Sequence, residues 1–232
     1  QTKDLTGLLS LDDNLKLAFS KLSEAGSLLG VPIAHPYFSV SDMSRLEKLT
    51  KAVSRTRVLV VDRDGVINRK PARWSYVTSP SELEFIEDSV EAMKRLAAQG
   101  FDFVIATNQA GVGRGVMSIS DLARVNNSVV SFLSEEGVSV LGVYSCIHDW
   151  EANCWCRKPQ PGLLYKAAGE IGLFLEGLFM VGDSSSDVLA ARSAGMHSAM
   201  ISSQRDLSVN PDMIASSFNE LVDPIVEHYS RL

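Results

Sequence analysis

The sequence predicts an α/β fold in which a doubly wound parallel sheet carries helices on both faces. From residue 57 onward, short β-branched apolar runs alternate with amphipathic helical patterns, and glycines separate many of these segments. The chain has 232 residues and is 45% hydrophobic, which is enough to bury one large core. We therefore expect one α/β domain at 56–232 and a helical extension of unknown role at 1–55.

Five apolar runs have the length and composition of buried parallel strands. The predicted strands are 57–62, 101–107, 138–145, 178–183 and 197–201. The predicted helices are 87–99, about 120–136, about 161–171, the segment from 183 to about 195, and about 217–230. Parallel strands need a crossover between them, and these helices supply it.

Composition and charge exclude several classes of protein. The net charge of −6 argues against a non-specific nucleic-acid binder, which needs a basic face. No apolar run approaches the ~18 residues that span a bilayer, so we expect no membrane association. All three cysteines lie at 146–156, which is a poor disulfide framework and favours a metal site in a reducing compartment. We expect a cytoplasmic protein whose partner is a small metabolite.

Polar residues follow four of the predicted strands. In open parallel sheets the ligand lies beyond the carboxyl ends of the strands. This rule selects four segments of the chain: 62–64, 107–109, 146–158 and 183–187. The functional site is therefore expected where these segments meet.

Two pairs of carboxylates suggest a magnesium site. Asp62 and Asp64 follow the first strand just before Gly65, and Asp183 and Asp187 follow the fourth. Neighbouring carboxylates repel unless a cation or a proton separates them, and Mg²⁺ prefers carboxylate oxygens. A solvated Asp-rich turn and acids that complement a helix N-terminus are the alternative interpretations of the two pairs.

Thr107, Asn108, Arg157 and Lys158 can bind an anion. The Thr107 hydroxyl, the Asn108 amide and nearby backbone amides can hold phosphate oxygens, and the two basic residues can neutralise a transferring phosphoryl group. A polar loop and an ordinary basic pair are the alternatives. The glycines at 111, 113 and 115 do not follow the spacing of a nucleotide loop, and we interpret them as loop flexibility.

Three thiols and one imidazole suggest a zinc site. Cys146, His148, Cys154 and Cys156 form a complete tetrahedral ligand set. Because this set leaves no open position, the expected role is structural: Zn²⁺ would hold the loop that delivers Arg157 and Lys158. Free cysteines beside a chance histidine are the alternative.

The order of these groups resembles the haloacid dehalogenase superfamily of phosphatases over about residues 56–225. The matching groups are Asp62-x-Asp64-Gly65, Thr107-Asn108, Lys158 and Gly182-Asp183-x3-Asp187. The strings DRDGVIN, TNQAGVGRG and RKPQPG are similar to a narrower branch, which contains heptose 1,7-bisphosphate phosphatases and histidinol-phosphate phosphatases. Members of this branch carry a similar Cys-His-Cys-Cys loop.

This resemblance implies a mechanism. Asp62 would attack phosphorus and form an aspartyl phosphate, and Asp64 would protonate the leaving oxygen and then activate water. Mg²⁺ would be held by Asp62, the Asp64 backbone carbonyl and Asp183. Thr107 and Lys158 would bind the phosphate.

The resemblance gives two further residues a role and leaves one contact in question. Asn108 and Arg157 would contact phosphate or orient the substrate. Many relatives carry a basic residue directly after the metal-binding Asp, whereas this chain has Ser184, so one contact near the metal is expected to be missing.

The segment between the first two motifs is too short for a cap domain. About 40 residues separate Asp64 from Thr107, and their sequence predicts a loop and one helix. Other residues must then shape the pocket of a capless enzyme. The candidates are the aromatic residues Trp74, Tyr76, Trp150 and Trp155.

Three functions remain open at this point. The leading hypothesis is removal of the 7-phosphate of D-glycero-D-manno-heptose 1,7-bisphosphate, on the pathway to activated heptose for cell-surface polysaccharide. The same reaction on histidinol phosphate is the alternative substrate. A non-catalytic, zinc-stapled binding module is the alternative from another class of protein.

Overall fold

A computed structural model describes residues 43–45, 57–72, 75–202 and 209–231. The chain separates into two compact units, 1–33 and 34–232, and all described residues belong to the second. Residues 43–45 are helical, as expected, and the rest of the predicted extension lies outside the described residues. The boundary between 55 and 56 therefore stays a prediction.

Six parallel strands form one sheet in the order β3-β2-β1-β4-β5-β6. They are β1 (Val58–Val61), β2 (Asp102–Asn108), β3 (Val140–Cys146), β4 (Phe179–Gly182), β5 (His197–Ile201) and β6 (Met213–Ala215). At the centre, Val60 of β1 pairs with Val104 of β2 and with Met180 of β4. The chain winds outward from β1 in one direction and from β4 in the other, so the strand order reverses between them. This reversal point is where doubly wound sheets bind ligands.

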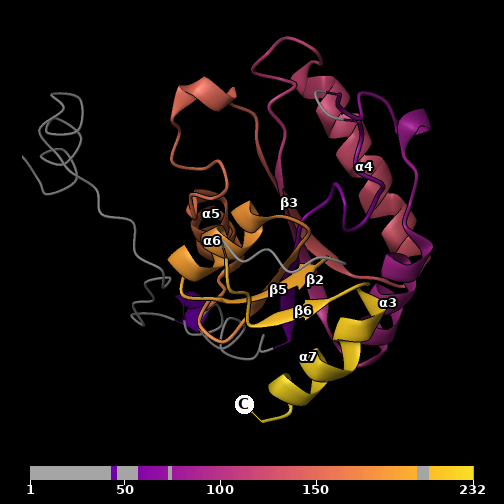
Figure 1. Cartoon of the computed structure of the whole chain (residues 1–232), viewed down its shortest axis with the longest axis vertical. Coiled ribbons are helices and arrows are strands. Elements are labelled where there is room, and N and C mark those ends of the chain that lie inside the picture. Colours follow the sequence, from indigo (N-terminus) through magenta and orange to yellow (C-terminus); the bar gives the residue numbers. More distant parts are fainter. Residues whose placement is uncertain (1–42, 46–56, 73–74, 203–208, 232) are drawn as a thin grey trace, which may run out of the picture. The chain divides into compact units, whose positions relative to one another are not determined.

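Helices cover both faces of the sheet. They are α3 (Glu87–Ala98), α4 (Ile119–Glu135), α5 (Gly162–Ile171), α6 (Ser185–Ser193) and α7 (Val222–Tyr229). Figure 1 shows α5 and α6 on one face and α3, α4 and α7 on the other. Three short 3₁₀ helices lie in the connections: η1 (Pro80–Glu82), η2 (Trp150–Ala152) and η3 (Asn219–Leu221).

The apolar runs form strands because both of their faces are covered. All four residues of β1 and all four of β4 are buried. Side chains from the helices, such as Met93 of α3 and Leu164 of α5, complete the core without measurable exposure. Ser118 starts α4 because its hydroxyl accepts the Asp121 backbone N–H at 3.0 Å, while the Asp121 carboxylate accepts the Ser118 N–H at 2.8 Å.

The five predicted strands and five predicted helices are all present, and two details differ. β6 was not predicted, because three residues are too short for a periodic apolar pattern to be recognised. The helix predicted over 217–230 begins with η3 and becomes α-helical at Val222.

The connection between β1 and β2 bears on the shape of the site. In its described part, η1 and α3 are the helices present, in agreement with a fold that lacks a cap domain there. No helix in the described part of the chain has the length and apolar character needed to cross a membrane.

Candidate active site

The candidate site lies where β1 and β4 end side by side. Asp62 directly follows β1, and its backbone N–H donates to Val181 O of β4 at 3.0 Å. Asp183 directly follows β4. The strand pairing therefore brings these two carboxylates, 121 positions apart in the sequence, to one edge of the sheet.

Lys158 joins the two acidic segments. Its Nζ lies 3.0 Å from Asp62 Oδ1 and 2.6 Å from Asp187 Oδ1, and it donates to Ala106 O at 2.7 Å. The residue is almost fully buried. Burial alone would lower the pKa of Lys158, but Asp187 and Asp62 outweigh it and raise the pKa above the usual 10.5. The buried ammonium is therefore charged at neutral pH.

The carboxylates carry more negative charge than the basic residues balance. Burial raises the pKa of Asp62 to about 7, with Asp187 and Asp64 adding to the shift and Lys158 opposing it. Burial also raises the pKa of Asp183, against the effect of Lys70. Three carboxylates at this edge, Asp62, Asp183 and Asp187, face two ammonium groups, so one negative charge is unbalanced when all three are ionised.

These residues suit a hard divalent cation. Asp62, Asp183 and Asp187 each offer a carboxylate oxygen, and the three oxygens lie within 4.8 Å of one another. Oxygen ligands and uncompensated negative charge are what Mg²⁺ requires. The donor set at the ends of β1 and β4 therefore fits Mg²⁺. The Asp64 carboxylate has other partners, and the expected contact of its backbone carbonyl with Mg²⁺ stays a prediction.

Lys70 supplies a positive charge next to Asp183. Its Nζ lies 2.7 Å from Asp183 Oδ2 and 3.0 Å from Oδ1. The sequence prediction left a gap here, because Ser184 stands where many relatives carry a basic residue. The loop after β1 places Lys70 beside Asp183 from a position 113 residues away in the sequence, so sequence spacing gave no signal for this ion pair. The expected loss of one contact near the metal stays a prediction.

Gly65 allows Asp183 to reach the site. Its φ is +92°, and a Cβ added at this position would lie 2.1 Å from Asp183 Oδ2. No other residue avoids both the backbone strain and this collision. The Gly in the D-x-D-G string therefore has a geometric role.

The Asp64 carboxylate is held by three neighbouring side chains. Arg63 donates to it from Nε and Nη2 at 3.0–3.1 Å. Asn68 Nδ2 donates to Oδ1 at 2.9 Å, and Gln109 Nε2 donates to Oδ2 at 2.7 Å. The sequence prediction gave these three residues no role, although all three lie inside the strings DRDGVIN and TNQAGVGRG.

Thr107 and Asn108 end β2 beside the site. The Thr107 hydroxyl is buried and accepts from Gln109 Nε2 at 2.9 Å. Asn108 Nδ2 donates to Lys158 O at 3.0 Å, and Asn108 Oδ1 accepts the Lys158 N–H at 3.1 Å. Both ends of the Asn108 amide thus hold the backbone of Lys158. The expected contact of Asn108 with a phosphate stays a prediction.

Cys146, His148, Cys154 and Cys156 come together as one cluster. Cys146 Sγ lies 3.5 Å from the sulfurs of Cys154 and Cys156, and Cys156 Sγ lies 3.2 Å from His148 Nδ1. Zn–S bonds of about 2.3 Å imply tetrahedral edges of about 3.8 Å between sulfurs. The donor set and its spacing therefore fit Zn²⁺.

The loop at 146–156 packs tightly against the loop that follows β2. A Cβ at Gly113 would lie 2.5 Å from Asp149 N and 2.7 Å from Ile147 O. Gly113 thus permits close contact between two backbones, and the interpretation of this glycine as loop flexibility was wrong. Arg114 stacks on Trp150, with 4.0 Å between its guanidinium carbon and a ring centroid.

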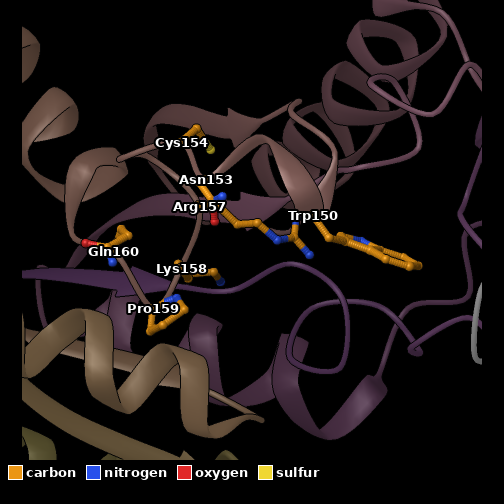
Figure 2. Close-up of a pocket in the computed structure, with 7 residues that line it drawn as sticks. All are labelled: Trp150, Asn153, Cys154, Arg157, Lys158, Pro159 and Gln160. Carbon is orange, nitrogen blue, oxygen red and sulfur yellow. The ribbon is translucent and has the colours of Figure 1, made fainter.

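Two cavities border these residues. One of about 260 Å³ is lined by Asp64, Lys70, Pro71, Ala72, Ser75, Tyr76 and Trp150. The other, of about 370 Å³, is lined by Trp150, Asn153, Cys154, Arg157, Lys158, Pro159 and Gln160. Figure 2 shows the Arg157 side chain extended toward Trp150. Arg157 Nη1 is buried and has no hydrogen-bond partner among the described residues.

The aromatic candidates behave differently from one another. Tyr76 and Trp150 line the cavities as expected. Trp155 is 58% exposed and its ring contacts Gly162, and it does not line either cavity. Trp74 lies outside the described residues.

Comparison with known proteins places these motifs in a family. The HAD-hydrolase-like family model, where HAD stands for haloacid dehalogenase, matches residues 155–221. A D-glycero-beta-D-manno-heptose-1,7-bisphosphate 7-phosphatase of Helicobacter pylori strain J99 is 33% identical over 173 residues, which cover 74% of this chain and 98% of that protein.

Two solved structures share the fold. A D,D-heptose 1,7-bisphosphate phosphatase from B. bronchiseptica, complexed with magnesium and phosphate, has a TM-score of 0.65 and 26% identity over 74% of this chain and 98% of its own. A putative HAD-like phosphatase from Mesorhizobium loti has a TM-score of 0.64 and 29% identity over 74% of this chain and 87% of its own. The chain is thus a phosphomonoester hydrolase of the haloacid dehalogenase superfamily and belongs to the family of the heptose 1,7-bisphosphate phosphatases.

Proposed function

We propose that this enzyme removes the 7-phosphate of D-glycero-D-manno-heptose 1,7-bisphosphate through an aspartyl phosphate on Asp62. The observation that carries the chemistry is the buried Asp62 carboxylate beside Lys158 Nζ. Asp183 lies at the same edge of the sheet. The relatives named for this substrate support its choice.

In the first step, an Asp62 carboxylate oxygen forms a bond to phosphorus while the bond from phosphorus to the C7 oxygen of the sugar breaks. Asp64 gives its proton to that oxygen, so heptose 1-phosphate leaves as an alcohol. In the second step, Asp64 takes a proton from water, the water oxygen bonds to phosphorus, and Asp62 is released with inorganic phosphate. Lys158 and Thr107 hold the phosphoryl oxygens during both steps.

Asp62, Asp183 and the Asp64 backbone carbonyl would hold Mg²⁺. When bound, this cation neutralises phosphate charge and favours the ionised form of the nucleophile. Asp187 stays paired with Lys158 and with Ser184, whose N–H donates to Asp187 Oδ2 at 3.1 Å. Asp187 therefore orients the lysine rather than the substrate.

A second phosphate needs a second positive group. The buried Arg157 Nη1 has no hydrogen-bond partner among the described residues and borders the larger cavity, as Figure 2 shows. We assign Arg157 to the 1-phosphate, because a guanidinium binds phosphate through two parallel hydrogen bonds. Tyr76 and Trp150 then form the walls next to the sugar.

The first experiment compares phosphate release from heptose 1,7-bisphosphate and from histidinol phosphate in the presence of Mg²⁺. Wild type should prefer the heptose, and Asp62→Asn should abolish release. Asp223→Asn is the control, because Asp223 is a surface carboxylate paired with Arg95 and is 85% exposed. Preference for histidinol phosphate would keep the mechanism and change the pathway. Activity that survives Asp62→Asn would exclude the mechanism.

We also propose that Cys146, His148, Cys154 and Cys156 hold one structural Zn²⁺. Arg157 and Lys158 directly follow Cys156, the last of these ligands, so losing the metal should lower both thermal stability and activity. Metal analysis of purified protein should give one zinc per chain, and Cys154→Ser should remove it. A zinc-free wild type with full activity would contradict this assignment.

A further inference from the structure

Arg63 is an arginine buried between the two acids of the D-x-D-G string. Its side chain has no exposed surface. Nε and Nη2 donate to the Asp64 carboxylate at 3.0–3.1 Å, and Nη1 donates to Asn126 Oδ1 of α4 at 2.9 Å. Its backbone N–H donates to Asp62 Oδ1 at 2.7 Å. One residue therefore touches both acids and a helix 63 residues away in the sequence.

We propose that Arg63 and Asn126 are positioning residues that fix the carboxylate of Asp64 for proton transfer to the leaving group. This inference rests on the proposed function, because it takes Asp64 as the proton donor. Neither residue touches the reacting atoms, and both act through Asp64.

The geometry favours a positioning role because each link is rigid. A guanidinium is planar, so three hydrogen bonds to Asp64 and one to Asn126 fix the orientation of its plane. Asn126 is itself anchored, since its Nδ2 donates to Ser145 Oγ of β3 at 3.2 Å. The position of Asp64 is thus tied through Arg63 and Asn126 to α4 and β3.

The site would lose this alignment without Asn126. In Asn126→Ala, the buried Arg63 Nη1 is left without its acceptor, and an unpaired charged donor in the interior is costly. The guanidinium must then turn toward another acceptor, and its bonds to Asp64 turn with it. Asn68 and Gln109 still hold the carboxylate but cannot set the plane that Arg63 sets.

If Asn126 only supported the fold, its loss would lower activity equally on all substrates. If it positions the proton donor, the loss should depend on the leaving group. An alcohol leaves only with a proton, whereas a nitrophenolate leaves without one. The ratio kcat/KM reports the steps up to release of the leaving group, so hydrolysis of the aspartyl phosphate does not affect it. Misplacing the proton donor should therefore slow poor leaving groups most.

The experiment measures kcat/KM for heptose 1,7-bisphosphate and for a series of phenyl phosphates with increasingly electron-withdrawing groups. In Asn126→Ala, we expect a loss of roughly 10–100-fold for the heptose and less than about threefold for para-nitrophenyl phosphate. Asn127→Ala is the matched control, because Asn127 is the exposed neighbour on α4. Asn127→Ala should leave kcat/KM unchanged for every substrate.

Two further variants keep the test decisive if Asn126→Ala folds poorly. Asn126→Asp keeps an acceptor for Arg63 and should restore most of the heptose activity. Arg63→Lys keeps the charge without the planar fork and should repeat the leaving-group dependence of Asn126→Ala. An equal loss on all substrates, or no loss on any, would overturn the positioning role. Activity surviving Asp62→Asn would instead overturn the proposed function itself.

Discussion

A single missing methyl group at Gly65 determines whether Asp183 can reach the site. Gly65→Ala would place a Cβ 2.1 Å from Asp183 Oδ2. We expect the carboxylate to be displaced and kcat/KM for the heptose substrate to fall by at least about 100-fold. Steady-state kinetics at saturating Mg²⁺ measures this loss.

Gly100→Ala is the control that separates collision from backbone strain. Gly100 has a similar φ of +82°, yet a Cβ there would meet nothing within 4 Å. Both substitutions carry the same left-handed strain of roughly 1–2 kcal/mol. Gly100→Ala should therefore lower stability and leave kcat/KM unchanged. Similar activity losses in the two variants would show that strain, not the collision, is responsible.

Arg157→Ala should distinguish a bisphosphate from a monophosphate. If the guanidinium binds the 1-phosphate, its loss should raise KM for heptose 1,7-bisphosphate by roughly 10–100-fold, which corresponds to one lost charged hydrogen-bonding group. KM for a sugar with a single phosphate at C7 should change little. Equal effects on both substrates would instead place Arg157 at the reacting phosphate.

At the scale of residues, the sequence predicts the groups that follow strands and misses the groups that support them. Asp62 and Asp183 could be predicted because the carboxyl ends of parallel strands meet. Arg63 could not, because an arginine between two aspartates suggests a solvated turn, whereas its side chain is fully buried. Lys70 could not either, because only the folded loop brings it to Asp183.

At the scale of elements, α7 is tied to the two central strands by one hydroxyl. Tyr229 Oη donates to Val58 O of β1 at 2.8 Å and accepts the Phe179 N–H of β4 at 3.0 Å. Tyr229→Phe removes both bonds and leaves two buried backbone groups unpaired. We expect the free energy of unfolding in urea to fall by roughly 2–4 kcal/mol, with kcat unchanged.

Tyr165→Phe is the matched control for that substitution. The Tyr165 hydroxyl donates to Ser193 O at 2.9 Å in an exposed position, where water can replace the lost partner. The free energy of unfolding of Tyr165→Phe should differ from that of wild type by less than about 1 kcal/mol. A comparable loss in both variants would show that the burial of the Tyr229 bonds does not matter.

Fully buried strands were predictable, and the short, partly exposed strand β6 was not. β1 and β4 are recognisable in the sequence as apolar runs, because helices cover both faces of the sheet and bury every residue of these strands. β6 is three residues long and pairs with β5 from Ala199 to Ile201, and three residues are too few for an apolar pattern to mark it as a strand. The pairing partner, rather than the local sequence, determines that this segment is a strand.

At the scale of the whole molecule, His228 should make stability depend on pH. Burial lowers the pKa of His228 below its usual 6.5, and nearby His197 and Arg231 lower this pKa further. A hydrogen bond with the Gly177 backbone and the charge of Asp212 oppose the shift. Because the unfolded chain binds the proton more readily, stability is complete above pH ~6.5 and declines as the pH falls below it.

The comparison of wild type with His228→Asn isolates this effect. The free energy of unfolding of wild type should fall more steeply from pH 7 to pH 5 than that of the variant. Asp62 acts in the opposite direction because its pKa is raised to about 7, but its contribution is common to both proteins and cancels in the difference. Parallel curves would rule out His228 as the origin.

The two edges of the sheet differ in how well they resist pairing with another chain. At one edge, β6 offers only three residues, too short to template an added strand. At the other, β3 is seven residues long and ends at Cys146, the first member of the zinc cluster. A metal ion that fixes Cys146 would also fix the end of the longer edge. Zinc-depleted protein is therefore expected to aggregate through β3, and the proposed metal would then protect the chain during folding as well as hold the loop in the finished enzyme.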